Sequence, residues 1–151
     1  MSESTSRPGR PRGWLFVIPA IIILALILNG LDPAARRARL YFLDAHRTRL
    51  AVETRNLSLV GSLEERSKQV LEELMLGPIG YSLQPLFKQD ARLGTVMHRG
   101  SRLTVELTIP DPAGLDVSFR LIRSAFEKTI SASVPGAGAL DLYVNGNPAI
   151  R

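Results

Sequence analysis

Histidine and cysteine, the residue types that most often hold metals or act as nucleophiles, are scarce: the 151 residues include two histidines and no cysteine. Neither His46 nor His98 has a second histidine or a pair of carboxylates three or four residues away, the spacing that places two metal ligands on one helix face. The lack of cysteine also excludes a thiol nucleophile, a disulfide framework and a lipid-modified cysteine. The sequence therefore predicts no metal site and no cofactor.

Serines and carboxylates, which could catalyse hydrolysis, form no recognisable catalytic pattern. No serine stands in the G-x-S-x-G sequence of a nucleophile elbow. Glu64-Glu65 and Glu72-Glu73 fall largely on the solvated side of a predicted helix and do not face one another across a cleft. Gly136-Ala137-Gly138 precedes a predicted strand, whereas a phosphate-binding loop leads into a helix N-terminus. We therefore predict no catalytic residues and a protein that is not an enzyme.

The positive charge of the chain is concentrated near its N-terminus. Residues 1–39 contain six arginines and two acidic residues, whereas residues 40–151 contain 13 basic and 12 acidic residues. A surface that follows a phosphate backbone needs clustered cations on the folded domain. The formal net charge of +5 therefore does not predict a nucleic-acid partner.

Residues 14–31 form a run of 18 residues without a charge. A helix of that length spans roughly 27 Å of an about 30 Å hydrocarbon core, so the run predicts a transmembrane signal anchor. A cleaved signal peptide is the alternative, and it stays open because the same Arg-rich start precedes exported proteins. Residues 1–13 are predicted to be a disordered cytoplasmic tail, and residues 32–38 a short linker. The domain would then lie outside the cytoplasm, tethered by a single pass through the cytoplasmic membrane.

The elements expected after the linker alternate between strands and amphipathic helices. Ser62 and Glu65 have the spacing of a capping box, and Gly77-Pro78 ends the helix that follows. The apolar alternation changes phase between Val52 and Leu57, which predicts a bulge or bend. The expected strands are 40–44, 50–59, 93–99, 102–109 and 140–144, and the expected helices are 63–76 and 116–131. This order, ββαββαβ, predicts one small α+β domain over residues 39–151, with a mixed sheet and two helices on one face.

In its order and spacing this pattern resembles a GerMN domain, the module of sporulation and spore-germination proteins of the GerM type. The residues that carry the resemblance are LYFLD at 40–44, Glu53 and Arg55, Leu74 to Pro78, Val105 to Thr108, Lys128 to Ile130, and Tyr143 to Pro148. The chain departs from the family at Lys88 to Ala91, where a Pro-Gly-Thr-like turn is common. The resemblance implies an exported or membrane-anchored protein that acts through protein contacts, with no established catalytic residues.

Large apolar residues gather in a stretch rich in glycine and proline, and two interpretations are open. The stretch contains Ile79, Tyr81, Leu83, Leu86 and Phe87. These side chains either cover the end of the core or form an exposed patch for a partner. Leu121 falls off the inward face of the second predicted helix. The candidate partner-binding residues are therefore Tyr81, Leu86 and Leu121.

Two classes of function fit these expectations. The first is a membrane-anchored scaffold or interaction module of the cell envelope, of the sporulation or cell-wall assembly type, whose partners are envelope proteins. The second is a module that binds peptidoglycan or another small ligand, which would need exposed aromatic side chains along a groove. Tyr41, Tyr81 and Tyr143 are scattered in the sequence, which favours the first class. Whether the protein forms a homo-oligomer is left open.

Overall fold

The computed structural model of the chain describes residue 21 and residues 35–88 and 90–149. By its contacts the chain divides into two units, Met1–Pro33 and Ala34–Arg151, and the second holds the domain. The tail predicted at residues 1–13 and the span predicted at residues 14–31 lie outside the described residues, apart from the helical Ile21. Among the residues that are described, no helix combines the length and the hydropathy needed to cross a membrane.

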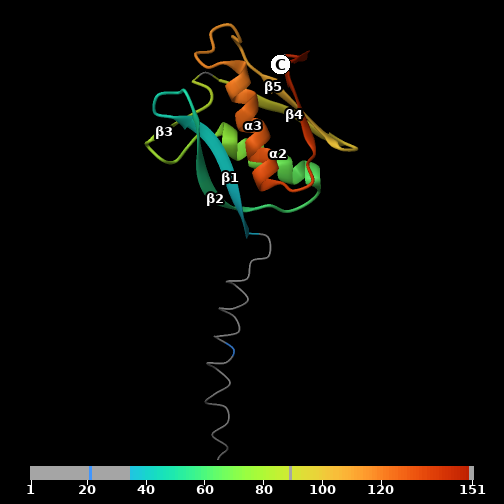
Figure 1. Cartoon of the computed structure of the whole chain (residues 1–151). Coiled ribbons are helices and arrows are strands. Elements are labelled where there is room, and N and C mark those ends of the chain that lie inside the picture. The colour runs from blue at the N-terminus through green and yellow to red at the C-terminus, as the bar shows by residue number, and fades with distance from the viewer. Residues whose placement is uncertain (1–20, 22–34, 89, 150–151) are drawn as a thin grey trace, which may run out of the picture. The chain divides into compact units, whose positions relative to one another are not determined.

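The domain is a small α+β fold, as predicted, with two short strands added to the expected order (Figure 1). Its strands are β1 (Ala35–Asp44), β2 (Leu50–Ser58), β3 (Leu83–Gln84), β4 (Arg92–Arg99), β5 (Arg102–Thr108), β6 (Ala139–Val144) and β7 (Asn147–Pro148). Its helices are α2 (Leu63–Met75) and α3 (Phe119–Ser133). Ser62 caps α2 by accepting a hydrogen bond from the Glu65 N–H at 3.2 Å, which confirms the predicted capping box.

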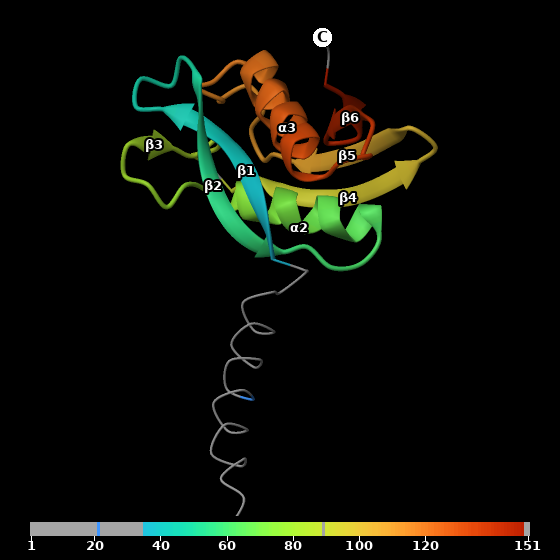
Figure 2. The same cartoon turned by 60° about the horizontal axis from the view of Figure 1, so that its bottom comes forward.

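The strands form two sheets, which corrects the prediction of a single sheet. One sheet has the order β2-β1-β3, and the other has the order β4-β5-β6-β7. The second sheet is mixed, because β5 and β6 are parallel while the other pairs are antiparallel. Helix α3 packs against β1 and β6, and α2 packs against β4 and β1 (Figure 2). The helices therefore join the two sheets to each other and do not simply cover one face of a continuous sheet.

Side chains of α3 explain why β1 does not continue into the second sheet. The hydroxyl of Thr129 accepts a hydrogen bond from the Tyr41 N–H at 3.0 Å. The hydroxyl of Ser133 accepts from the Arg39 N–H at 2.9 Å and donates to the Arg39 carbonyl at 3.1 Å. Buried backbone N–H and C=O groups need hydrogen-bond partners. Here the hydroxyls of α3 provide the acceptors and the donor that the backbone of a neighbouring strand would otherwise provide. Because α3 hydroxyls occupy the backbone groups of Arg39 and Tyr41, no strand of the second sheet pairs with β1 there.

Replacing Thr129 by valine should lower the free energy of unfolding by about 1–3 kcal/mol, because it keeps the shape of the side chain but leaves the Tyr41 N–H without an acceptor. Urea unfolding followed by far-ultraviolet circular dichroism measures this change. Thr108→Val on β5 is the control: Thr108 is exposed, and the change should stay within about 0.5 kcal/mol. An equal effect of the two substitutions would contradict the role given to the Thr129 hydroxyl.

Strand β1 begins earlier than predicted, at Ala35, so the last residues of the linker predicted at 32–38 belong to the domain. The reason is the length of β2: its nine residues pair with β1 in one unbroken register, from Leu43 opposite Leu50 to Ala35 opposite Ser58. The bulge predicted between Val52 and Leu57 is therefore absent from this pairing. The change of apolar phase has a different cause, the ion pair described below.

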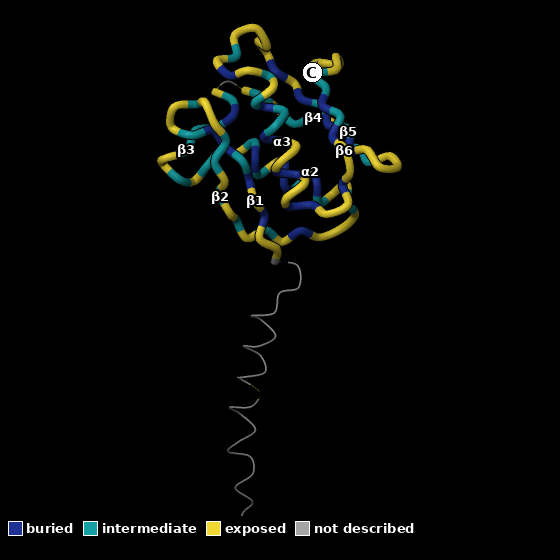
Figure 3. Tube along the Cα trace, viewed as in Figure 1, coloured by how far each residue is buried: buried dark blue, intermediate teal, exposed yellow. Residues whose placement is uncertain are grey.

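The core lies where the two helices meet both sheets, and its β1 residues are Ala38, Leu40, Phe42 and Leu43 (Figure 3). The largest fully buried side chains include Phe42, Leu40 and Leu43 of β1 and Phe126 of α3. The rings of Phe126 and Phe87 meet edge to face, with centroids 6.5 Å apart. Phe87 belongs to the Gly- and Pro-rich segment after α2, so this segment closes one side of the core.

Candidate interaction surface

Three large apolar side chains on the α2–β3 loop are exposed to solvent. The exposed fraction is 78% for Leu76, 75% for Ile79 and 104% for Tyr81. We call these three residues the apolar tip. Single exposed apolar residues are common on protein surfaces, but three within six positions of one loop make this loop the candidate contact for a partner.

A network of charged side chains fixes the loop that carries the apolar tip. The Glu53 carboxylate accepts hydrogen bonds from the Ile79 N–H at 3.1 Å and the Gly80 N–H at 3.0 Å. The Arg55 guanidinium donates to the Gly77 carbonyl at 2.5 Å and to the Glu73 carboxylate at 2.9 Å. Strand β2 thus holds both the end of α2 and the loop that follows it, so the tip is presented on a fixed backbone.

The two central charges of this network are mostly buried and paired with each other. Nη2 of Arg55 lies 2.7 Å from Oε1 of Glu53, and the exposed fractions of the two side chains are 9% and 15%. The guanidinium also lies over the Phe42 ring, 5.5 Å from its centroid, where the ring face attracts a cation. Burial raises the pKa of Glu53, but the N–H groups of Gly80 and Ile79 and the Arg55 cation outweigh burial, so the pKa lies below the ordinary value.

The network also explains the change of apolar phase in β2. Residues 51, 53, 55 and 57 form the half-buried side of the strand, and residues 52, 54, 56 and 58 are exposed. Glu53 and Arg55 therefore point inward, and Val52 points outward. Charged residues at alternate positions are normally read as outward ones, and this reading of Glu53 and Arg55 led to the prediction of a bulge or bend. The unbroken register shows that the bulge is absent.

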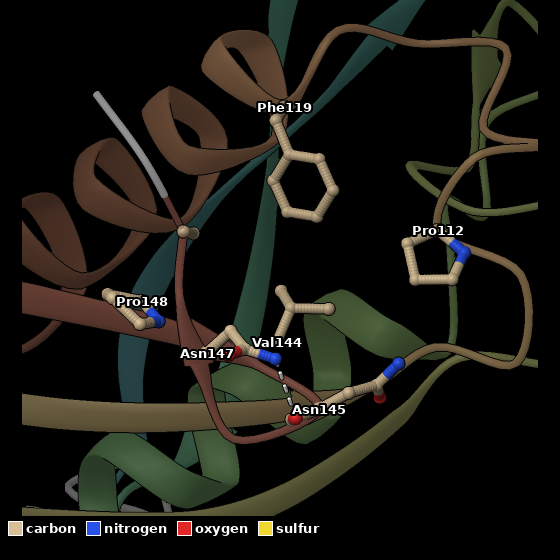
Figure 4. A pocket seen from close by; sticks show the side chains of 7 residues that line it. Pro112, Phe119, Val144, Asn145, Asn147 and Pro148 are labelled. Atoms are coloured by element: carbon tan, nitrogen blue, oxygen red, sulfur yellow. Dashed lines mark hydrogen bonds between the residues drawn. The ribbon is translucent and has the colours of Figure 1, made fainter.

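A separate hollow of about 370 Å³ opens near the end of β6, lined mostly by apolar atoms (Figure 4). Its lining residues are Pro112, Phe119, Val144, Asn145, Asn147, Pro148 and Ala149. The Asn145 side chain is already engaged, because its amide accepts from the Ile109 N–H at 3.0 Å and donates to the Ile109 carbonyl at 2.8 Å. The hollow brings together segments that are distant in the sequence, and no sequence pattern signalled it.

Solved structures with a similar fold come from a sporulation protein. The first GerMN domain of the sporulation protein GerM from Bacillus subtilis aligns with a TM-score of 0.53 and 18% identity, over 75% of this chain and 85% of that one. Residues 35–149 of the present chain therefore have a fold like that of a GerMN domain. The tandem GerMN domains of the same protein align with a TM-score of 0.52 and 17% identity, over 76% of this chain and 40% of that one. The sequence matches no protein-family model and no curated protein.

The sequence segments that suggested a GerMN domain have defined places in this GerMN fold. Tyr143 to Pro148 form the hairpin of β6 and β7, turned at Asn145 and Gly146, whose φ angles are 49° and 78°. Two successive positive φ angles are typical of a type I′ turn, which favours Asn-Gly. Lys128 to Ile130 include Thr129, whose hydroxyl covers the edge of β1. Glu53 and Arg55 anchor the loop of the apolar tip.

The three residues predicted to bind a partner do not share one surface of the domain. Tyr81 is fully exposed and belongs to the apolar tip. Leu86 is buried with 2% of its surface exposed, so it is a core residue and cannot serve as a surface contact. Leu121 is half-buried and packs against the core. Leu76 and Ile79 are exposed and form the apolar tip together with Tyr81. Leu76 was predicted to be the last residue of the helix, so its apolar side chain gave no sign of being exposed.

The histidines and the carboxylates of α2 lie in separate surroundings. His46 is exposed in the turn between β1 and β2, and the backbone N–H of His98 donates to the Glu64 carboxylate at 3.1 Å. Glu73 pairs with Arg55, and Glu72 lies 3.9 Å from Lys68. Within residues 35–88 and 90–149, no three histidine or carboxylate side chains are grouped as a metal site would require.

Proposed function

We propose that this chain is a non-enzymatic interaction module of the cell envelope, a GerMN-family protein held in the cytoplasmic membrane by residues 14–31. The domain lies outside the cytoplasm and contributes to an assembly of the sporulation or cell-wall type. The fold shared with GerM domains supports the class of protein. The uncharged run of 18 residues supports the anchor.

The apolar tip carries the proposal, because it is both exposed and fixed. Binding loses affinity when a loop must be ordered at the moment of contact. Here the bonds from Glu53 and Arg55 to the loop backbone order it in advance. Tyrosine is one of the residue types enriched in binding hot spots, so Tyr81 is the central contact of the tip. We assign the tip as the contact with another envelope protein.

Substitutions in the tip should abolish partner binding without unfolding the domain. Tyr81→Ala and Ile79→Asp each should reduce cross-linking to the partner in the native membrane at least about tenfold, the loss expected for a hot-spot residue. The melting temperature should stay unchanged, because an exposed side chain adds little to stability. Val60→Ala is the matched control, since Val60 is also apolar and 57% exposed but lies on the β2–α2 loop.

Variants at His46, His98 and Glu72 separate this proposal from catalysis. Each should leave cellular function intact, because catalysis would depend on a few ionisable groups and binding does not. Loss of function in these variants with a normal melting temperature, together with healthy tip variants, would favour an enzyme. A reporter fused after Arg151 that is active only in the cytoplasm would refute the proposed orientation.

The hollow beside Phe119 supports the second candidate, a module for a small ligand. Its apolar lining suits a compact apolar group better than a glycan, which needs several free hydrogen-bonding groups. Peptidoglycan fragments should therefore leave the backbone resonances of Asn147 and Ala149 unchanged in nuclear magnetic resonance spectra. A saturable shift confined to these residues would move the assignment of function to ligand binding.

A further inference from the structure

The outer face of the β1–β2 hairpin is basic and has no carboxylate. Ala38, Leu40 and Phe42 of β1 are buried, and the side chains that alternate with them lie on the other face of the strand. On that face Arg37 and Arg39 are exposed, whereas Tyr41 is half-buried and packs against the edge of the core. Cross-strand neighbours lie on the same face of a sheet. The outward pairs are Arg37 with Asn56, Arg39 with Thr54 and Tyr41 with Val52. The face thus carries two exposed arginines, and none of its six residues is acidic.

Helix α3 adds a third cation to this face. The ammonium of Lys128 lies 5.9 Å from the centroid of the Tyr41 ring. Lys128 precedes Thr129, whose hydroxyl is bonded to the Tyr41 N–H, so the edge contact between α3 and β1 places the lysine there. Both views of the fold show α3 running beside β1 (Figures 1 and 2). We call Arg37, Arg39, Lys128 and Tyr41 the basic face.

The three cations of the basic face have no carboxylate partner among the described residues. Other cations of the domain do: Arg47 pairs with Asp116, Arg102 with Asp141, and Arg123 with Glu127. Unpaired cations on this sheet face leave a positive potential that no acidic side chain of the face neutralises. The ring of Tyr41 and the exposed side chain of Val52 add an apolar centre to this charge.

We propose that the basic face docks the domain onto the anionic phospholipid headgroups of its own membrane. Headgroup phosphates match unpaired cations, and a tyrosine suits the boundary between headgroups and acyl chains. The inference rests on the anchor of the proposed function. Arg37 follows the end of the predicted span by six residues, and six residues reach at most about 20 Å. This reach is about twice the Debye length of 8–10 Å at physiological salt, so the headgroup charge acts on the basic face only when the face approaches the membrane, and a short tether keeps such approaches frequent.

The full chain, reconstituted in lipid vesicles, tests this docking. Because the chain has no cysteine, Thr54→Cys attaches a single fluorophore opposite Arg39, beside the basic face. A quencher attached to lipid lowers its fluorescence when this face contacts the membrane. Quenching should be stronger in vesicles containing phosphatidylglycerol than in pure phosphatidylcholine, and 1 M salt, where the Debye length is about 3 Å, should remove the difference. Equal quenching in both vesicle types would overturn the proposal.

Charge variants identify the residues responsible. Each basic residue near an anionic surface strengthens the interaction by roughly fivefold, so Arg37→Gln with Arg39→Gln should lower the ratio of docked to undocked domain by about 30-fold. Arg92→Gln with Arg99→Gln is the matched control, because these exposed β4 arginines also have no carboxylate partner among the described residues. If both double variants lowered the ratio of docked to undocked domain equally, docking would depend only on the net charge of the domain, and the proposal would be wrong.

Two further readouts separate docking from anchoring and from polymer binding. Flotation of the full chain with phosphatidylcholine vesicles in 1 M salt reports the anchor alone. If the chain fails to float there, the anchor is refuted, and docking is then judged by salt-sensitive flotation with phosphatidylglycerol vesicles. If soluble polyglycerol phosphate displaces the labelled face from anionic vesicles at equal phosphate concentration, the face prefers a polymer and the phospholipid assignment is wrong.

Discussion

Replacing Arg55 by methionine should lower the free energy of unfolding by about 3–5 kcal/mol. Methionine keeps the apolar stem but removes the cation, which leaves the mostly buried Glu53 carboxylate without its partner. The Gly77 carbonyl and the Glu73 carboxylate lose their donor as well. Removing one member of a buried charged pair is costly because the other charge stays buried and uncompensated. Urea unfolding followed by far-ultraviolet circular dichroism measures the loss.

Arg123→Met is the matched control for this prediction. Arg123 pairs with Glu127 one helical turn away, and both side chains are considerably more exposed than those of Arg55 and Glu53. Such a pair adds about 0.3–0.5 kcal/mol, so the control should be nearly neutral. If Arg55→Met were also nearly neutral, the network would not hold the loop, and the apolar tip would lose its preorganisation.

The pH dependence of stability gives a second check of the same network. The folded-state pKa of Glu53 lies below its unfolded value, so the carboxylate contributes stability above the unfolded pKa and loses it as the pH falls through the folded pKa. Stability should therefore decrease on acidification. Glu53→Gln should make that decrease shallower, because it removes one carboxylate that takes up a proton as the pH falls. An unchanged slope would show that other carboxylates, such as Asp44 and Asp116, dominate the acid range.

Features decided by neighbours in the sequence were predictable, and features decided by distant contacts were not. The capping box of Ser62 and Glu65 spans three positions, so its chemistry could be read directly. The inward orientation of Glu53 and Arg55 could not, because the other partners of Arg55, Glu73 and Gly77, follow it by 18 and 22 residues. A charged residue that alternates with apolar ones looks solvated until its buried partner is known.

The same distinction explains the division into two sheets and the placement of Leu86. The hydroxyls that cover the edge of β1 come from residues 88 and 94 positions further along the chain. Thr129 falls on the inward face of the predicted helix, but the helix pattern does not show which backbone group its hydroxyl meets. Ser133 lies beyond the predicted end of that helix, although both residues are buried. Leu86 stands in a segment without periodicity, where composition alone cannot tell a core residue from a surface one. Tyr81 is in the same segment and points outward.

Phe126→Ala should destabilise the domain by about 3–5 kcal/mol, the range for deleting a fully buried aromatic ring. Phe126 has no exposed surface, and its ring packs edge to face on Phe87. Because α3 contacts β1 on one side and β6 on the other, a cavity at Phe126 opens where both sheets and both helices meet. The surrounding side chains belong to separate elements and cannot all move inward together, so the cavity should collapse only in part.

Tyr81→Ala is the control for the loss of an aromatic ring, since Tyr81 is fully exposed and its removal should change stability by no more than about 0.5 kcal/mol. The pair of substitutions separates the two roles of aromatic residues in this domain. Phe126→Ala should lower both the urea midpoint and partner cross-linking, because an unfolded domain presents no tip. Tyr81→Ala should lower only the cross-linking. If Phe126→Ala cost less than about 1 kcal/mol, α3 would not be the element that joins the two sheets.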